Sequence, residues 1–248
     1  MLTGPLGAFA IVAFELLAGT FLLMLATSLV WRSISRGHLR ATTWVLMPLA
    51  GAASFLVDGL LRTGGLVFAA LMLLFGLAVV SQRPLLEWLA GSAAAFSAVF
   101  VVATVGFEIC PSPCSSGVVH ASVGTLFLGA VTHGMVLGHW YLNQPRLPIE
   151  PLKGATIWLF ASLLASLLLG VIARADLTGG LVRTGLFPFA AESFWWVWFG
   201  LLVSTAALGI MIRQTVWIRS TQSATGLLYI AMVPALGAQF IISLLAIR

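Results

Sequence analysis

Two of the chain's four histidines lie in one short stretch, VTHGMVLGHWYLNQPRLPIEP, which covers residues 131–151. Near neutral pH an imidazole can donate or accept a proton at a quinone carbonyl, and aromatic rings offer a flat apolar wall. A single histidine can also be an axial ligand of a b-type haem. The stretch is therefore a candidate quinone or haem site, and the competing interpretation is that it only packs helices together at the membrane border. The candidate residues are His133, His139, Trp140, Tyr141 and Arg146.

The haem interpretation depends on how many histidines can face one another. His120 and His133 are 13 residues apart, a spacing similar to that of the two haem-ligating histidines on one helix of cytochrome b. That family needs two more histidines on a facing helix, and here the remaining candidate, His38, falls in the predicted first inside loop. At most one haem is expected, with His133 as its preferred ligand. The alternative for His133 is a neutral imidazole that is hydrogen-bonded to a neighbouring helix.

Glu15 is the acid with the most informative position. It stands in IVAFELLAGTFLL, about a third of the way into the first apolar run, with no charged neighbour in sequence. An ionised carboxylate in hydrocarbon costs several kcal/mol, so the side chain should be protonated, paired or facing water. Glu15 is therefore a candidate proton carrier. The alternative is a neutral Glu15 that is hydrogen-bonded to a neighbouring helix, which Gly19 allows to come close.

The two cysteines form a C-x3-C pattern in FEICPSPCSSGVVH. Because this loop is predicted on the oxidising side of the membrane, Cys110 and Cys114 are expected to form a disulfide. The spacing is similar to the copper-binding loop of purple-copper domains, but His120 follows too late, and the chain has no second histidine at this loop and no β-domain. Two thiols alone make a poor metal site, so the sequence identifies no metal.

Membrane helices must position all of these residues. Hydrophobic residues make up 60% of the chain, charged residues make up 8%, and the mean hydropathy is +1.10. Apolar runs of about 20 residues, enough to cross a hydrocarbon core of roughly 30 Å, recur along the chain. The predicted fold is all-α, a polytopic transmembrane helical bundle that forms a single integral membrane domain over residues 1–248. About eight spans are expected, near 7–31, 42–61, 65–81, 88–107, 118–142, 155–173, 194–213 and 222–246.

The number of spans could be seven, because the third is short and a tight Arg62–Gly64 link would join it to the second as a hairpin. Basic residues collect in cytoplasmic loops, and an N-terminus outside puts eight of them inside and four outside. The inside set is Arg32, Arg36, Arg40, Arg83, Arg146, Lys153, Arg213 and Arg219. A cell-membrane, multi-pass location of the bacterial inner-membrane type is expected. The net charge of +5 then reflects insertion and contact with membrane lipids rather than nucleic-acid binding.

The helix predicted over 118–142 has two distinct faces. At 100° per residue, four small or polar residues share one face within about 80°, which predicts close packing against another helix. They are His120, Gly124, Gly134 and Gly138. His133 projects from a different face together with Trp140, so each histidine needs a partner from elsewhere. The tryptophan-rich run SFWWVWFG, residues 193–200, is expected to contact lipid at the membrane border, and the alternative is that its three tryptophans line a flat ring system.

The motifs of soluble enzymes are absent: the sequence has no G-x-S-x-G, no H-E-x-x-H, no Walker loop and no G-x-G-x-x-G that begins a helix. A stand-alone enzyme is therefore not expected. The interior polar residues are few, and no repeat of one half in the other is evident. The sequence favours an integral membrane subunit of a larger respiratory or electron-transfer complex, which anchors membrane or membrane-associated partners and contributes a quinone or single b-haem site. The alternative is a small-molecule or proton-coupled transporter.

Overall fold

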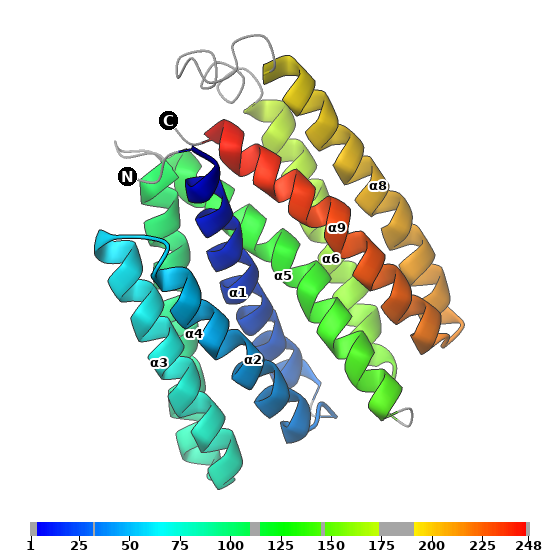
Figure 1. The fold of residues 1–248 in the computed structure, drawn as a ribbon. Coiled ribbons are helices and arrows are strands. Elements are labelled where there is room, and N and C mark those ends of the chain that lie inside the picture. The colour runs from blue at the N-terminus through cyan, green and yellow to red at the C-terminus, as the bar shows by residue number, and fades with distance from the viewer. Residues whose placement is uncertain (1–3, 32, 110–114, 145–146, 174–190, 247–248) are drawn as a thin grey trace.

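The computed structural model describes residues 4–31, 33–109, 115–144, 147–173 and 191–246. Within these ranges there are eight helices and no strand, so the predicted all-α polytopic bundle is confirmed (Figure 1). Seven of the helices are long and apolar enough to cross a membrane; α2, which contains two arginines and a proline, is the exception. The helices are α1 (Gly4–Val30), α2 (Arg36–Ser54), α3 (Gly59–Ser81), α4 (Pro84–Ile109), α5 (Ser115–Asn143), α6 (Glu150–Ile172), α8 (Ala191–Trp217) and α9 (Thr221–Ala246).

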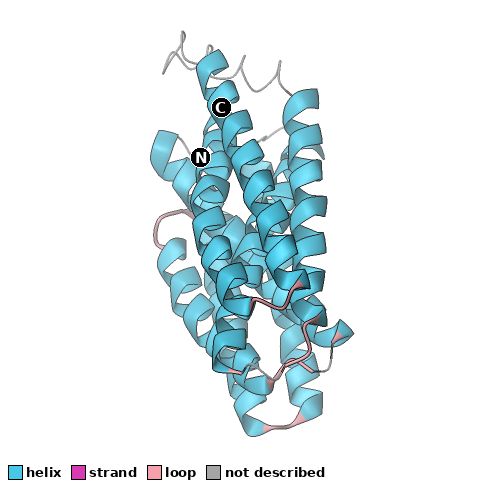
Figure 2. Cartoon of the chain, turned by 90° about the vertical axis from the view of Figure 1, so that its right-hand side faces the viewer, coloured by secondary structure: helices cyan, strands magenta, loops and turns pink. Residues whose placement is uncertain are grey.

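The helices run side by side, and both ends of the chain lie at the same end of the bundle (Figures 1 and 2). The links α1–α2, α3–α4, α5–α6 and α8–α9 lie at the opposite end, which we call the inner end. The basic residues expected inside lie in or beside these links, where they can contact anionic lipid headgroups. Those that the structure describes are Arg36, Arg40, Arg83, Lys153, Arg213 and Arg219.

The bundle consists of two groups of four helices. The first half, α1 to α4, and the second half, α5 to α9, each bury their own cluster of apolar side chains, with a few residues of α1 and α5 reaching into the other cluster. Helix α1 packs against α2, α4, α5 and α9, while α5 packs against α6, α9, α1 and α4. The first helix of each half therefore lies at the boundary between the halves, in the middle of the bundle.

The two central helices touch at glycines. A Cβ atom on Gly19 of α1 would lie 1.9 Å from the carbonyl oxygen of Thr125 and 2.9 Å from the Cα of Gly129, both in α5. Because the atoms that it would meet belong to the backbone, only glycine allows this approach. The Gly19 contact sets how closely α1 and α5 pack over their whole length.

Two tryptophans tie the halves together at the inner end. Trp31, which follows α1, packs on Gly154 of α6, where a Cβ would lie 2.3 Å from the indole ring. Trp140, near the end of α5, packs on Gly37 of α2, where a Cβ would lie 3.1 Å from the ring. Each central helix thus places an indole on the second helix of the opposite half.

The turn between the second and third helices differs from the prediction. The structure places it at residues 55–58, and the predicted Arg62–Gly64 link lies inside α3. Asp58 has an extended backbone and Gly59 has a φ of +64°, a left-handed conformation that glycine adopts without strain. Arg62 approaches Asp58 at 3.8 Å on the surface at the start of α3. The turn therefore occurs where the backbone can reverse, and it begins seven residues earlier than the apolar pattern indicated.

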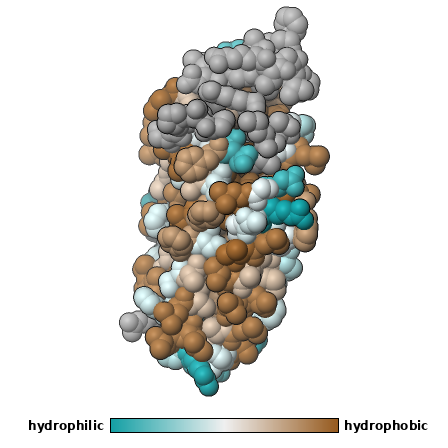
Figure 3. All heavy atoms as spheres, turned by 90° about the vertical axis from the view of Figure 1, so that its left-hand side faces the viewer, coloured by the Kyte–Doolittle hydropathy of each residue, from teal (hydrophilic) through white to brown (hydrophobic). Residues whose placement is uncertain are grey.

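On the face that Figure 3 shows, the surface of the described helices is mostly apolar, with hydrophilic residues in small groups. The expected lipid contact of the tryptophan-rich run is wrong for two of its three tryptophans. Trp195 and Trp198 are buried, and the Trp198 ring lies against Gly170 of α6, whereas Trp196 is exposed. Gly170 has no side chain, so the space beside its backbone accepts a large ring that would otherwise face the acyl chains.

Candidate functional site

The glycine face predicted on α5 is confirmed, and its partner is α9. A Cβ on Gly124 would meet Gln239, one on Gly134 would meet Leu228, and one on Gly138 would meet Thr225. These contacts hold α5 and α9 close along most of their length. The other faces of α5 contact α1, α4 and α6, and α2 over a small area.

One of those faces carries a group of polar and aromatic side chains near the inner end, which we call the inner cluster. Its members come from α1, α2 and α5: they are Thr27, His38, His133 and Trp140. The ring centroid of His38 lies 6.2 Å from that of His133 and 5.7 Å from that of Trp140. Histidine side chains 95 residues apart in sequence are thus brought together by the contact between the halves.

The start of α2 positions His38. Ser35 is the N-cap of this helix, and its hydroxyl accepts a hydrogen bond from the backbone N–H of His38 at 3.3 Å. In the same turn, Nε of Arg36 lies 3.4 Å from Oε2 of Glu87, and this ion pair attaches the start of α2 to α4. The cap and the ion pair therefore fix the first turn of α2, and the contact of Gly37 with Trp140 places this turn, and with it His38, against α5.

The imidazoles of the inner cluster are buried but poorly satisfied. His38 and His133 are 0% and 1% exposed. Both ring nitrogens of His38, Nδ1 of His133 and Nε1 of Trp140 have no hydrogen-bond partner. Buried polar atoms are usually paired, so four unpaired nitrogens in one place are unusual and make the inner cluster a candidate binding site for a polar ligand.

The hydrogen bonds of Thr27 determine which nitrogen of His133 carries a proton. The Thr27 hydroxyl donates to the carbonyl oxygen of Leu23 at 2.6 Å and lies 2.9 Å from Nε2 of His133. A hydroxyl has one hydrogen, so Nε2 of His133 must be the donor in the second bond. A neutral His133 then carries its proton on Nε2, and its Nδ1 is a free acceptor.

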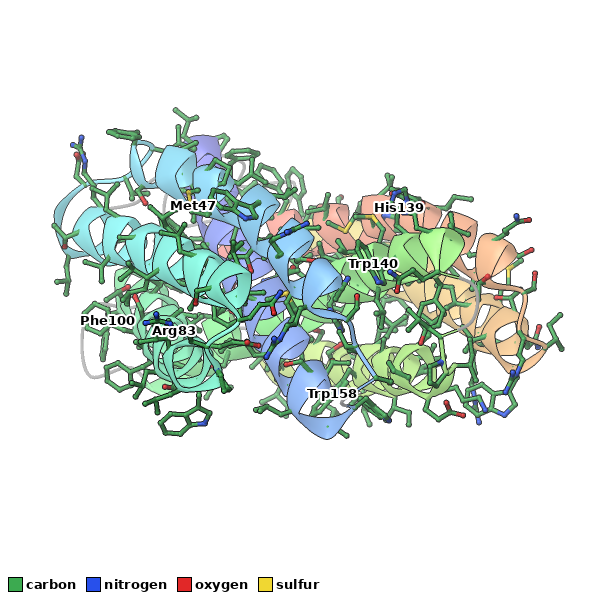
Figure 4. All side chains as sticks on the ribbon, turned by 90° about the horizontal axis from the view of Figure 1, so that it is seen from below. Met47, Arg83, Phe100, His139, Trp140 and Trp158 are labelled. Carbon is green, nitrogen blue, oxygen red and sulfur yellow. The ribbon has the colours of Figure 1, made fainter. Side chains whose placement is uncertain are left out.

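The other residues predicted in this stretch lie in different surroundings. His139 is exposed, and Figure 4, seen from the inner end, shows it at the rim of the bundle while Trp140 lies between α2 and α5. Tyr141 is buried and its hydroxyl donates to the carbonyl oxygen of Pro148. Arg146 lies outside the described residues. Among the described members of the predicted set, the structure therefore brings only His133 and Trp140 together.

The placement of His38 in a loop is wrong. It lies in the first turn of α2 and faces His133, so the chain does present two histidines to each other on different helices. The sequence contains a signal for this arrangement in SRGHLR, because a serine before a helical segment is a common N-cap. A helix that begins after Ser35 would have included His38.

Glu15 lies further from the inner end, at the boundary between the halves. It is fully buried, and its Oε2 accepts a hydrogen bond of 2.8 Å from Nε2 of Gln239 in α9. Its Oε1 has no partner. The expected hydrogen bond to a neighbouring helix is thus present, while the proton-carrying role stays a prediction.

Metal ligands do not gather in the part of the chain that the structure describes: no group of three or more His, Cys, Asp or Glu side chains there could hold an ion. Cys110 and Cys114, the predicted disulfide, lie outside the described residues. No protein-family model matches the chain, and no curated protein and no solved structure is significantly similar to it. The function must therefore be argued from the geometry of the bundle.

Proposed function

We propose that the chain is an integral membrane subunit of an electron-transfer complex that binds a quinone headgroup at the inner cluster. The observation that carries this proposal is the set of buried, unpaired nitrogens on His38, His133 and Trp140. Its setting supports the proposal, because an apolar helical bundle in the cell membrane, of the bacterial inner-membrane type, is surrounded by the phase in which quinones dissolve.

The chemistry of these nitrogens favours a quinone over a metal or a haem. The indole nitrogen of Trp140 is a donor only and cannot bind a metal, but it can donate to a quinone oxygen. Nδ1 of His133 is a free acceptor, which suits the hydroxyl of a quinol, and His38 can act as donor or acceptor. Together the three side chains can recognise both oxygens of the headgroup in either redox state.

The ring separations indicate how the headgroup would approach. A planar ring stacked between two others needs about 7 Å, twice the contact distance of carbon atoms, and the rings of His38 and His133 are 6.2 Å apart. The headgroup would therefore contact the edges of the imidazoles from the side of Trp140, which is only partly buried. Reduction of the quinone takes two electrons from a redox centre of a partner subunit and two protons, which the imidazoles can pass on.

Quinone binding to the protein purified from membranes in a mild detergent tests the proposal. A short-chain quinone should bind saturably, and His38→Leu and His133→Leu should each weaken binding about tenfold, as expected for one lost hydrogen bond of roughly 1.4 kcal/mol. His139→Leu is the matched control, since this exposed histidine is on the same helix and should leave binding unchanged.

Two results would overturn the quinone assignment. One is an absence of saturable binding to the wild-type protein, or equal binding by all variants. The other is a Soret band in the wild-type protein that disappears in His38→Leu and His133→Leu, which would assign a haem to the same residues. Purification without any stoichiometric partner subunit would contradict the complex.

A proton-coupled transporter is the second candidate, and the observation that favours it is Glu15 at the boundary between the two halves. Transporters often bind their coupling ions where structural repeats meet. Proton uptake by liposomes that contain the purified chain alone, and its loss in Glu15→Gln, would support this candidate. Liposomes that take up protons no faster than empty ones would exclude it.

A further inference from the structure

A small cavity lies in the second half of the bundle, on the side of Gly124 that faces away from the inner end. It is bounded by α5, α6, α8 and α9, and it has room for about one water molecule. Polar atoms line one part of it, on His120, Ser166 and Gln239, and apolar side chains such as Phe127 and Trp198 line the rest. A space of this size with several polar atoms in one part of its wall suits an ordered water.

Two residues that line this cavity carry unpaired polar atoms, and a third unpaired atom lies on Gly124 beside it. Nε2 of His120 and Oγ of Ser166 are buried without a hydrogen-bond partner, as is Oε1 of Glu15. The carboxyl of Glu15 and the amide of Gln239 rest on Gly124, where a Cβ would lie 2.6 Å from Oε1 and 2.1 Å from the amide nitrogen. Gly124 and Gln239 both line the cavity, and His120 is one helical turn from Gly124. The cavity therefore extends from His120 to Gly124 and Gln239, the two residues that contact the carboxyl of Glu15.

Among the described residues, no cationic side chain of the helices packed on α1 lies at the same depth in the bundle as Glu15. Helix α1 has no other titratable residue, and α5 presents His120 one turn away. The remaining titratable or charged residues of the helices packed on α1 lie toward the ends of those helices or toward the inner end. They are Arg36, His38 and Arg40 in α2, Glu87 and Glu108 in α4, His133, His139 and Tyr141 in α5, and Tyr229 in α9. A buried carboxyl without a cation is neutral, because ionisation in apolar surroundings costs several kcal/mol.

We propose that Glu15, His120 and Ser166 form a site that binds one exchangeable proton and one water molecule. The protonated Oε1 of Glu15 donates to the water, and the water donates to Nε2 of His120 and to Oγ of Ser166. All three unpaired atoms are then satisfied. Transfer of the proton from Glu15 through the water to His120 leaves a carboxylate and an imidazolium, so the total charge of the site is unchanged.

Infrared spectroscopy of the purified protein tests this site, because a protonated carboxylic acid has its own C=O stretching band. The spectrum of the wild type minus that of Glu15→Gln should contain such a band at neutral pH. The band should shift in D2O. In His120→Leu and Ser166→Ala, which both retain Glu15, the C=O band of Glu15 should lie at a different frequency from that of the wild type. Glu15→Gln retains an acceptor for Gln239, so it should assemble; if it does not, the shifts in the other two variants still decide.

Two control variants separate this site from general effects. Glu87→Gln removes an acid that lies beside Arg36 and should leave the band unchanged, and His139→Leu removes an exposed imidazole from the same helix as His120. The proposal is overturned if the difference spectrum has no acid band, since Glu15 would then be ionised. It is also overturned if the band is insensitive to D2O and to both cavity variants, since Glu15 would then only seal the helices together.

Discussion

Replacing Gly19 by alanine should separate the two central helices. The new Cβ would lie 1.9 Å from the carbonyl oxygen of Thr125, so the two atoms must move apart by about 1.5 Å to reach an ordinary contact of 3.4 Å. No side chain can yield, because the atoms met at Thr125 and Gly129 belong to the backbone. Overpacking of this kind costs about 1–3 kcal/mol, and the upper half of that range is expected since the helices must move as units.

The assay is thermal unfolding of the purified protein in detergent, where about 2–3 kcal/mol corresponds to a melting temperature lower by roughly 4–12 °C. Gly200→Ala in α8 is the matched control, because a Cβ there meets nothing within 4 Å. Alanine is the better helix former, so the control should melt at or above the wild-type temperature. Equal melting temperatures for the two variants would refute the close contact of α1 and α5.

Three further changes test separate contacts by the same measurement. Gln239→Leu should cost about 1–3 kcal/mol, since it leaves Glu15 buried without its donor, and Glu15→Leu in the same chain should restore part of the loss; no restoration would contradict the pairing. Gly170→Ala should cost about 1–3 kcal/mol because its Cβ would lie 2.0 Å from the buried Trp198 ring, and a wild-type melting temperature would mean that the ring lies elsewhere. Asp58→Asn should not change the melting temperature, as its pair with Arg62 is on the surface.

Much of the fold follows from local sequence. Apolar runs of membrane length predict the helices, and the glycine spacing on α5 predicts a close face that the structure finds against α9. The environment of Glu15 was also predictable in kind, because an isolated acid in an apolar run must find a hydrogen bond or a proton. Its partner was not: Gln239 is 224 residues away, and no local pattern indicates which helix faces which.

The candidate site was only half predictable. His133 and Trp140 share a face of α5 by helical periodicity, and this part of the site follows from the sequence. His38 was missed because the apolar pattern of α2 begins several residues after the helix itself, which starts at the Ser35 cap. The charged residues Arg36 and Arg40 made the segment look like a loop, although a helix can carry them where it leaves the membrane.

The central position of α1 has a consequence for biogenesis. This helix is synthesised before α5 and α9, which cover much of its surface. Until α9 follows, the polar side chain of Glu15 lacks Gln239 and must be accommodated by the insertion machinery, by water or by lipid headgroups. The amide of Gln239 reaches Glu15 only when α9 docks, so a chain truncated before α9 should be retained by membrane quality control rather than accumulate as a stable bundle.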